Sequence, residues 1–284
     1  MRRLLALVIT PNEAPPKESF GSDQTQIQIL GPNWGRSNYL AFTFKSERRY
    51  RNGLGWVVAY SFTRWIDNLL SFGTPLGDND QIQNIYDLKQ ERSLSTNDAP
   101  HRLVFSPIYD VPFPKGRGIV SQILGGWQIG MIGTLQSGSP FGVLVLNGPQ
   151  NLRGDSSNST VLRTDLVPGQ SLTVRAKGKP AAGERGIQWL NPAAFANPAQ
   201  YHLGSSSRTL PQVLGPPTIN FDSLLAKNFT RGDRWRAQVR WEMFNMTNTP
   251  NWALPNDTLG GASFGVITSA SSRRIMQLGL KLNF

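Results

Sequence analysis

Large apolar residues alternate with polar or small residues along several stretches of the chain, and the stretch at 274–284 shows the pattern most plainly. Its apolar positions are Met276, Leu278, Leu280, Leu282 and Phe284. The positions between them are Gln277, Gly279, Lys281 and Asn283. Because successive side chains of a β-strand point to opposite faces of a sheet, this order predicts a strand with one apolar and one polar face.

The same period of two recurs at 38–50, 53–65, 125–138 and 234–245, with weaker candidates at 24–30, 101–113 and 218–230. In 234–245 the apolar row consists of Trp235, Ala237, Val239, Trp241 and Met243. The opposite row consists of Arg234, Arg236, Gln238, Arg240 and Glu242. Such a strand is expected to meet an apolar medium on one face and water on the other.

The connections between the predicted strands are alternately short and long. The short ones lie near 51–53, 113–124 and 231–233, and the long polar ones near 67–100, 147–217 and 248–272. Outer-membrane barrels have short periplasmic turns and longer external loops. We therefore expect an all-β fold that forms part of an antiparallel, up-and-down transmembrane β-barrel, with about 7–8 strands of a larger barrel. The barrel portion is expected at 35–284 with a long external loop at about 147–217, and residues 1–34 as a poorly ordered segment or a partial strand.

The composition argues against several other classes of protein. No apolar run approaches the roughly 18 residues of a transmembrane helix. Cysteine is absent, which excludes disulfides and cysteine-based metal sites, and His101 and His202 lie on separate segments. The serines of "QSGSPFG" at 136–142 are not in a G-x-S-x-G arrangement and have no strand-to-helix context. We therefore expect no enzyme activity, no catalytic residue, no metal and no cofactor.

The net charge of +11 fits an anionic partner such as lipid head groups or nucleic acid. Five basic residues on the polar rows form a candidate lumen face: Lys45, Arg49, Arg236, Arg240 and Lys281. They could line a path for an anionic solute, but we favour a solvated lumen face that Glu47 and Glu242 partly neutralise. Aromatic residues near the strand ends are interpreted as an interfacial girdle: Trp56, Tyr60, Trp127, Trp235 and Trp241.

Two phrases, "DAPHRLVFSPIYDVPFPKGRG" at 98–118 and "LGGWQIGMIGTLQSGSPFGV" at 124–143, resemble the C-terminal barrel of TonB-dependent outer-membrane receptors, especially the Oar-like subgroup. The segments at 35–67 and 220–252 are similar to hairpins of that family. The last strand resembles the β-signal that the barrel-assembly machinery reads, carried here by Gln277, Gly279, Leu282 and Phe284. The resemblance implies location in the cell outer membrane, with lipid and the assembly machinery as partners and no role for nucleic acid.

The sequence departs from that family in what it lacks. The family implies a barrel of about 22 strands, an N-terminal plug and a TonB-contacting segment, and neither of the last two is recognisable here. We therefore expect the closing part of a receptor for a scarce solute, which would meet TonB only through a plug that these residues do not contain. The solute is not identified by any residue.

Two alternatives remain open at this stage. The chain could be a self-sufficient small outer-membrane barrel with a structural or adhesive role, because eight strands can close. It could instead be a soluble β-sandwich that binds a polyanion or carbohydrate through its basic and aromatic residues. The spread of basic residues over many strands, on the row opposite the apolar one, argues against the sandwich.

Overall fold

The computed structural model describes most of the chain and leaves several connecting segments outside its scope. The described residues are 7–9, 27–29, 35–68, 83–84, 87–113, 119–146, 162–174, 186–231, 235–271 and 273–283. No helix within these ranges is long and apolar enough to cross a membrane.

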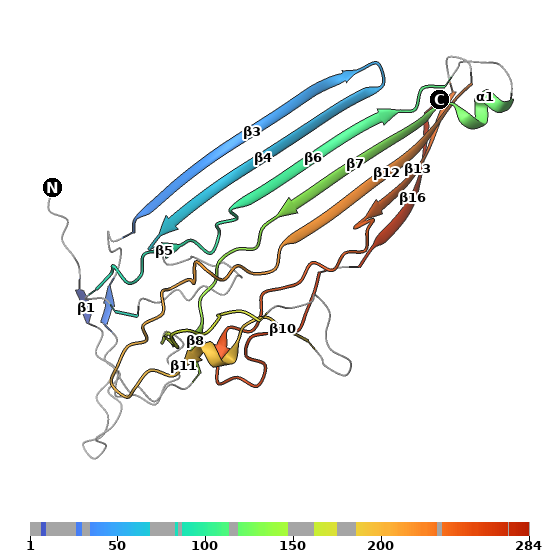
Figure 1. Ribbon diagram of the computed structural model, residues 1–284. Helices are drawn as coiled ribbons and strands as arrows, with labels where there is room; N and C mark the ends of the chain where they lie inside the picture. The colour runs from blue at the N-terminus through green and yellow to red at the C-terminus, as the bar shows by residue number, and fades with distance from the viewer. Residues whose placement is uncertain are drawn as a thin grey trace, which may run out of the picture.

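One antiparallel sheet dominates the fold. Its long strands are β3 (Ser37–Arg51), β4 (Leu54–Asp67), β6 (His101–Asp110), β7 (Trp127–Gln136), β12 (Thr218–Arg231), β13 (Trp235–Phe244) and β16 (Ile275–Asn283). Each lies beside the long strand that precedes it in the chain, so the sheet is an up-and-down meander (Figure 1). The short strand β5 (Ser93–Leu94) also pairs with β4, beyond the point where β6 begins. The structure therefore confirms the predicted all-β, antiparallel arrangement.

The sheet is open at both sides. Among the described strands, β3 pairs only with β4, and β16 pairs only with β13. The outer edge of each therefore presents backbone N–H and C=O groups that no described strand satisfies.

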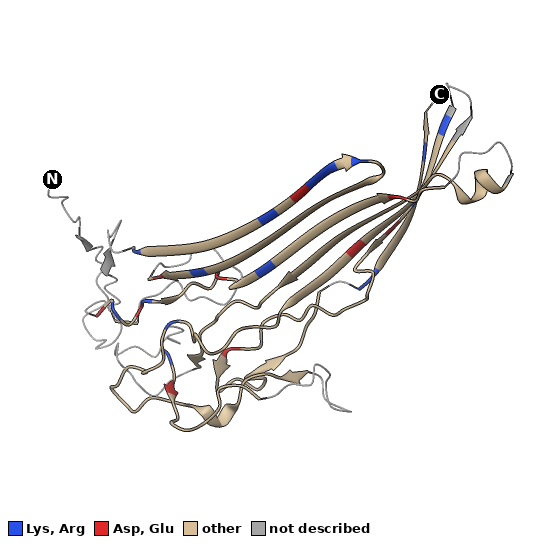
Figure 2. Cartoon of the chain, turned by 45° about the horizontal axis from the view of Figure 1, so that its top comes forward, with Lys and Arg blue, Asp and Glu red and all other residues tan. Residues whose placement is uncertain are grey.

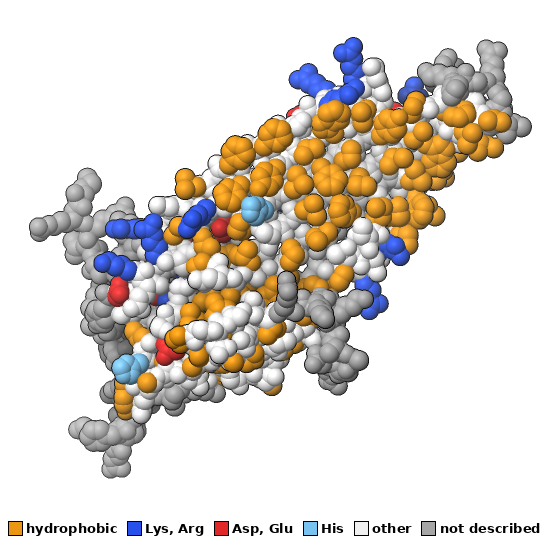
Figure 3. Space-filling model, viewed as in Figure 1, with side chains coloured by type: hydrophobic (Ala, Val, Ile, Leu, Met, Phe, Trp, Pro, Cys, Tyr) orange, Lys and Arg blue, Asp and Glu red, His pale blue; other side chains and the backbone are white. Residues whose placement is uncertain are grey.

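The two faces of the sheet differ sharply in character. The register places Phe42 opposite Phe62, and Trp241 opposite Leu278, so the apolar rows of neighbouring strands join into one surface. Its side chains are strongly exposed, with Leu278 at 78%, and Figure 3 shows hydrophobic atoms covering the strands. We call this surface the lipid face. The opposite rows form the lumen face.

The pairs β3–β4, β6–β7 and β12–β13 are each connected at the same end of the strands (Figure 1). The sequence pattern leads us to expect this end on the periplasmic side, and we call it the periplasmic end. The tightest connection joins β3 to β4 through Asn52 and Gly53, whose φ angles are 55° and 76°. The sequence predicted a short connection near 51–53. The turn falls at Asn52–Gly53 because a two-residue turn that matches strand twist needs positive φ at both positions.

The connection between β6 and β7 contains the short helix α1 (Ile119–Leu124). The alternating pattern did not predict it, because six residues are too few to show a helical period clearly. Glycines end the helix: the Gly125 N–H donates to the Ser121 carbonyl at 2.9 Å, and Gly126 has φ of 76°.

The long connections at the other end fold together. The described residues of 137–217 and 245–274 contain β8 (Leu144–Val145), β9 (Asp165–Leu166), β10 (Ile187–Gln188), η1 (Pro192–Ala194), β11 (Phe195–Ala196), β14 (Thr258–Leu259) and β15 (Val266–Ile267). β8 pairs with β14 and β10 with β15, so each of these two pairs joins one connection to the other. We call this unit the loop cap. A separate two-stranded sheet pairs β1 (Leu7–Ile9) with β2 (Ile27–Ile29), the latter within the weak candidate at 24–30.

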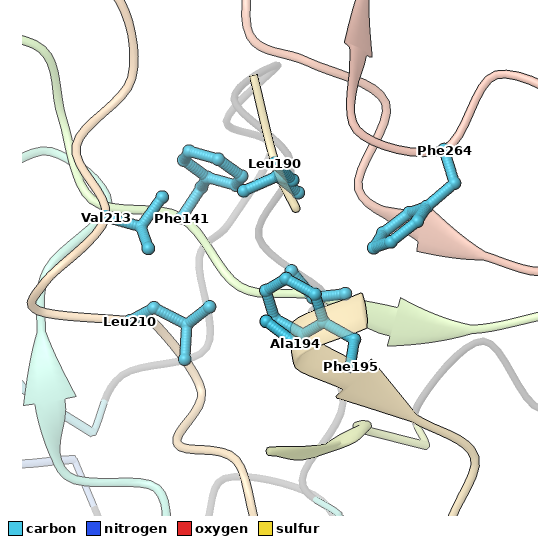
Figure 4. Close-up of a cluster of buried hydrophobic side chains, with 8 residues drawn as sticks. Phe141, Leu190, Ala194, Phe195, Leu210, Val213 and Phe264 are labelled. Atoms are coloured by element: carbon cyan, nitrogen blue, oxygen red, sulfur yellow. The ribbon is translucent and has the colours of Figure 1, made fainter. Parts of the chain in front are cut away.

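The loop cap holds the principal buried hydrophobic cluster among the described residues. Its members are Phe141, Val143, Leu190, Ala194, Phe195, Leu210, Val213 and Phe264, and most are labelled in Figure 4. The rings of Phe195 and Phe264 meet edge to face at 5.6 Å, which joins the two long connections. The water-excluding core therefore lies in the loops, while the strands keep their apolar side chains on the outside.

Leu190 is fully buried at the centre of this cluster, so Leu190→Ala should loosen the loop cap without disturbing the sheet. Truncation of a buried leucine typically costs about 2–5 kcal/mol. We expect faster proteolysis within 186–217. The shift in SDS-gel mobility between unheated and heated samples, which reports the folded barrel, should stay unchanged. The matched control is Leu146→Ala, because Leu146 belongs to the same cap but is exposed. Equal proteolysis of both variants would contradict a packed cap.

Candidate functional site: the lumen wall and the loop cap

The lumen face mixes polar, charged and small residues with some apolar ones, such as Val57 on β4 and Ile132 on β7. β7 contributes Gln128, Gly130 and Thr134 to it, and β13 contributes Arg236, Gln238 and Arg240. Figure 2 shows both basic and acidic residues along the strands. Such a surface suits contact with water and polar solutes rather than lipid.

The five predicted basic residues fall into two groups, one near each edge of the sheet. Arg236 and Arg240 lie on β13, and Lys281 pairs with Gln238 between them on β16, so these three are neighbours. Lys45 lies on the lumen row of β3, at the far edge. Arg49 lies on the same strand within a register irregularity between Arg48 and Arg51. The described sheet does not bring the two groups together.

Acidic neighbours offset part of this charge. The Lys45 ammonium donates to Glu47 at 2.8 Å, and the Arg240 guanidinium lies 3.6 Å from Glu242. Arg236 and Lys281 have no acidic partner among the described residues.

The predicted assembly-signal residues lie on β16, except for Phe284, which is outside the described residues. Leu282 belongs to the lipid face and pairs with Ala237. Gln277 belongs to the lumen face, where its amide donates to Glu242. Gly279, opposite Arg240, has open space around its Cα.

The predicted girdle aromatics lie on the lipid-face rows. Trp56, Tyr60, Trp127 and Trp241 alternate with lumen residues on β4, β7 and β13, and the register puts Trp235 on the same row as Trp241. Trp56 also lies 5.2 Å from the Arg48 guanidinium, a cation–π distance. Trp56 and Trp127 lie near strand ends, whereas Tyr60 lies in the middle of β4 and Trp241 pairs with Leu278 within the sheet, so the five residues do not all border the apolar surface.

Buried ion pairs attach the loop cap to the wall, and the sequence patterns did not reveal them. Asp67 ends β4 on the lumen row, and the Arg208 guanidinium donates to both its carboxylate and its backbone carbonyl. Arg208 also donates to the Glu91 carbonyl at 3.1 Å. All three residues are buried.

A second pair joins the 87–100 segment to the cap. The Arg163 guanidinium donates to the Glu91 carboxylate, and the Glu91 carboxylate also accepts from the Gln83 backbone N–H at 3.2 Å. The Gln83 side chain accepts from the Arg163 N–H at 2.9 Å and donates to the Gly204 carbonyl at 3.0 Å. We call the set Asp67, Gln83, Glu91, Arg163 and Arg208 the polar latch. It positions the cap over the lumen side of the strand ends.

Asp98 lies beside the polar latch in an unusual setting. Its side chain is 2% exposed, and one carboxylate oxygen accepts from the Thr63 hydroxyl at 2.9 Å while the other has no hydrogen-bond partner. Burial disfavours the charged form and raises the pKa of the Asp98 carboxyl, against smaller opposing effects of Thr63, Trp65 and Arg64.

The two histidines do not form a site. His101 lies on the lipid face, where its ring stacks against Tyr60 and meets Phe62 at 5.2 Å. His202 is exposed in the loop cap. No group of three or more metal-ligating side chains occurs in the described ranges. The arrangement that the described residues build is a polar wall with a fixed external cap.

A meander with one continuous exposed apolar face, one polar face, short turns at one end and large loops at the other defines a membrane β-barrel architecture. Comparison with known families supports this class. The family described as outer membrane beta barrel domain matches residues 9–277, and the chain belongs to this family. Its location is accordingly the outer membrane. No curated protein and no solved structure matches the chain.

Arg208→Met should release the loop cap from the wall, because Asp67 would be left as a buried charge without its ion-pair partner. Breaking a buried pair in this way typically costs about 3–5 kcal/mol. Hydrogen–deuterium exchange should rise in 87–100 and 204–213. Lys45→Met removes an exposed ion pair and should leave exchange in these segments unchanged. Similar exchange in both variants would show that the latch does not hold the cap.

The raised pKa of the Asp98 carboxyl can be tested by comparing the pH dependence of stability in Asp98→Asn and in the unaltered protein. A raised pKa in the folded state means that folding favours the protonated form, so its stabilising effect is present below the ordinary value of 3.8 and is lost as pH rises through the folded value. Relative to the unaltered protein, Asp98→Asn should therefore gain stability as pH rises through that window and then stay level. Exchange rates of 93–100, corrected for intrinsic pH dependence, measure the difference. A constant difference at all pH values would contradict the assignment.

Proposed function

We propose that these residues form the closing part of the barrel of a TonB-dependent outer-membrane receptor of the Oar-like kind, which imports a scarce solute. The observation that supports this proposal most directly is the open sheet. In a bilayer every backbone polar group must be paired within protein, so the edges of β3 and β16 require further strands. A larger barrel supplies such strands on both sides.

The size and order of the external loops support the same proposal. A receptor for a large solute needs an outer surface that meets the solute before the lumen does. The loop cap is folded around its own core and tied to the lumen side of β4 by Arg208. We propose the cap as the first point of contact for the solute, and the lumen wall as part of its path, with no catalytic step.

The partners in this proposal follow from the same placement. The lipid face contacts outer-membrane lipid, the β16 residues Gln277, Gly279 and Leu282 contribute to recognition by the barrel-assembly machinery, and TonB acts through a plug that these residues do not contain. No cofactor and no nucleic acid takes part.

The alternatives fit the structure less well. A self-sufficient small barrel needs β3 to pair with β16, yet in the described sheet β3 pairs with β4 and β16 with β13, and the two do not pair with each other. A soluble sandwich would cover its apolar face with a second sheet. Here that face is exposed on every long strand of the described sheet, from Phe42 on β3 to Leu278 on β16.

Immunoblotting of fractionated source cells, with an antibody raised against 147–217, tests the proposal. We expect a band well above 31.4 kDa in the outer-membrane fraction that also cross-links to TonB in energised cells. A band near 31 kDa in the same fraction would favour the small barrel. A soluble band of that size would exclude a membrane role, and a large band without TonB cross-linking would contradict the receptor assignment.

A further inference from the structure

Lys227 is a charged residue on the lipid face. The register places it opposite Trp127 on β7 and opposite Val239 on β13, both of which belong to the apolar rows. An ammonium group exposed to hydrocarbon would be costly. Lys227 is nevertheless only 6% exposed, so something covers it.

The cover is the C-terminal end of α1. The Lys227 ammonium donates to the carbonyls of Ile123 and Gly125, the former at 2.9 Å. The Trp127 indole N–H also donates to the Ile123 carbonyl, at 3.0 Å. The last carbonyls of a helix have no partner within the helix and carry partial negative charge, so a cation is favourable there.

Aromatic rings complete the setting of the ammonium group. It lies 5.1 Å from the ring centre of Trp127 and 5.3 Å from that of Phe229, both within cation–π range. Lys227 therefore fastens α1 against the outer wall of the sheet, at the periplasmic end. Its two hydrogen bonds go to carbonyls at and just beyond the end of α1.

The helix so fastened exposes apolar side chains. Val120 is 64% exposed, Ile123 59% and Leu124 48%. Their spacing of three and four residues places them on one side of the helix. They lie next to the lipid face, which begins on β7 with Trp127 and continues through Ile129. Figure 1 shows α1 projecting beside the strand ends, and Figure 3 shows hydrophobic surface reaching that end.

We propose that α1 is an interfacial helix that rests in the phospholipid leaflet on the periplasmic side of the outer membrane, with Val120, Ile123 and Leu124 among the acyl chains. Lys227 is the positioning residue that holds it there. The partner is phospholipid because the helix surface is continuous with the lipid face, which this family places in a bilayer. The helix widens the lipid contact of the barrel beyond its strands. The proposal is independent of TonB and of any solute.

Single cysteines test this contact cleanly, because the chain contains no cysteine of its own. Nitroxide labels at Val120→Cys and Ile123→Cys are measured in the full-length protein, in phospholipid bilayers, for collision with oxygen and with nickel ethylenediaminediacetate. The lipid reference is Leu280→Cys on the lipid face, and the water reference is Lys45→Cys on the lumen face. We expect the two helix labels to match Leu280, with high oxygen and low nickel accessibility.

Two results would overturn the proposal. Helix labels that match Lys45, with high nickel accessibility, would place α1 in water. Helix labels shielded from both reagents would mean that protein rather than lipid covers these side chains. Neither result depends on whether a substituted lysine variant folds.

Lys227→Met then tests the fastening role. Loss of the ammonium should make the Ile123 label more mobile and raise its nickel accessibility, while the Leu280 label stays unchanged. The matched control is Lys281→Met, which removes a lysine from the lumen face near the same end. An Ile123 label that is unaffected by Lys227→Met would show that Lys227 does not hold the helix.

Discussion

The structure depends on one constraint: in a lipid bilayer, no water is present to satisfy backbone N–H and C=O groups, so the strands must satisfy one another. The antiparallel ladder from β3 to β16 meets this need for every interior strand. The same medium explains why large side chains such as Leu40, Phe42 and Leu278 are exposed, which would be unfavourable in water. It also makes the two open edges the most informative feature of the sheet.

Because the outer face is occupied by lipid, the protein places its own hydrophobic core elsewhere. That core lies in the loop cap, around residues such as Phe141 and Leu190, and it resembles the core of a small soluble domain. The polar latch connects the cap to the wall through charges that water does not reach, such as those of Asp67 and Arg208. A buried pair can add little net stability, because removing two charges from water offsets their attraction, yet loss of one partner is strongly destabilising. The pairs of the latch hold the cap in one position over the lumen side.

At the periplasmic end, the charge that must be satisfied away from water is a single ammonium group on the lipid face. Lys227 stands on an apolar row, and helix carbonyls together with Trp127 satisfy its charge. The short helix α1 thereby becomes part of the outer wall. The two ends of the sheet therefore differ. One carries a water-facing cap held by ion pairs, and the other carries a lipid-facing helix held by one lysine.

The sequence by itself determined the strands, the two faces and the barrel class. The period of two is local, because apolar residues for lipid and polar residues for water alternate within each strand. Rows such as Met276 to Leu282 could be assigned without coordinates, and the family comparison agrees with the barrel class. Only the tertiary structure decided which loops pack together, that Arg208 reaches Asp67, and that Lys227 caps α1. These contacts join residues about 100 or more positions apart, and no local pattern specifies a partner at such separation. The period of two puts Lys45, Arg236, Arg240 and Lys281 on polar rows, whereas their division between β3 and the β13–β16 pair follows from strand order alone.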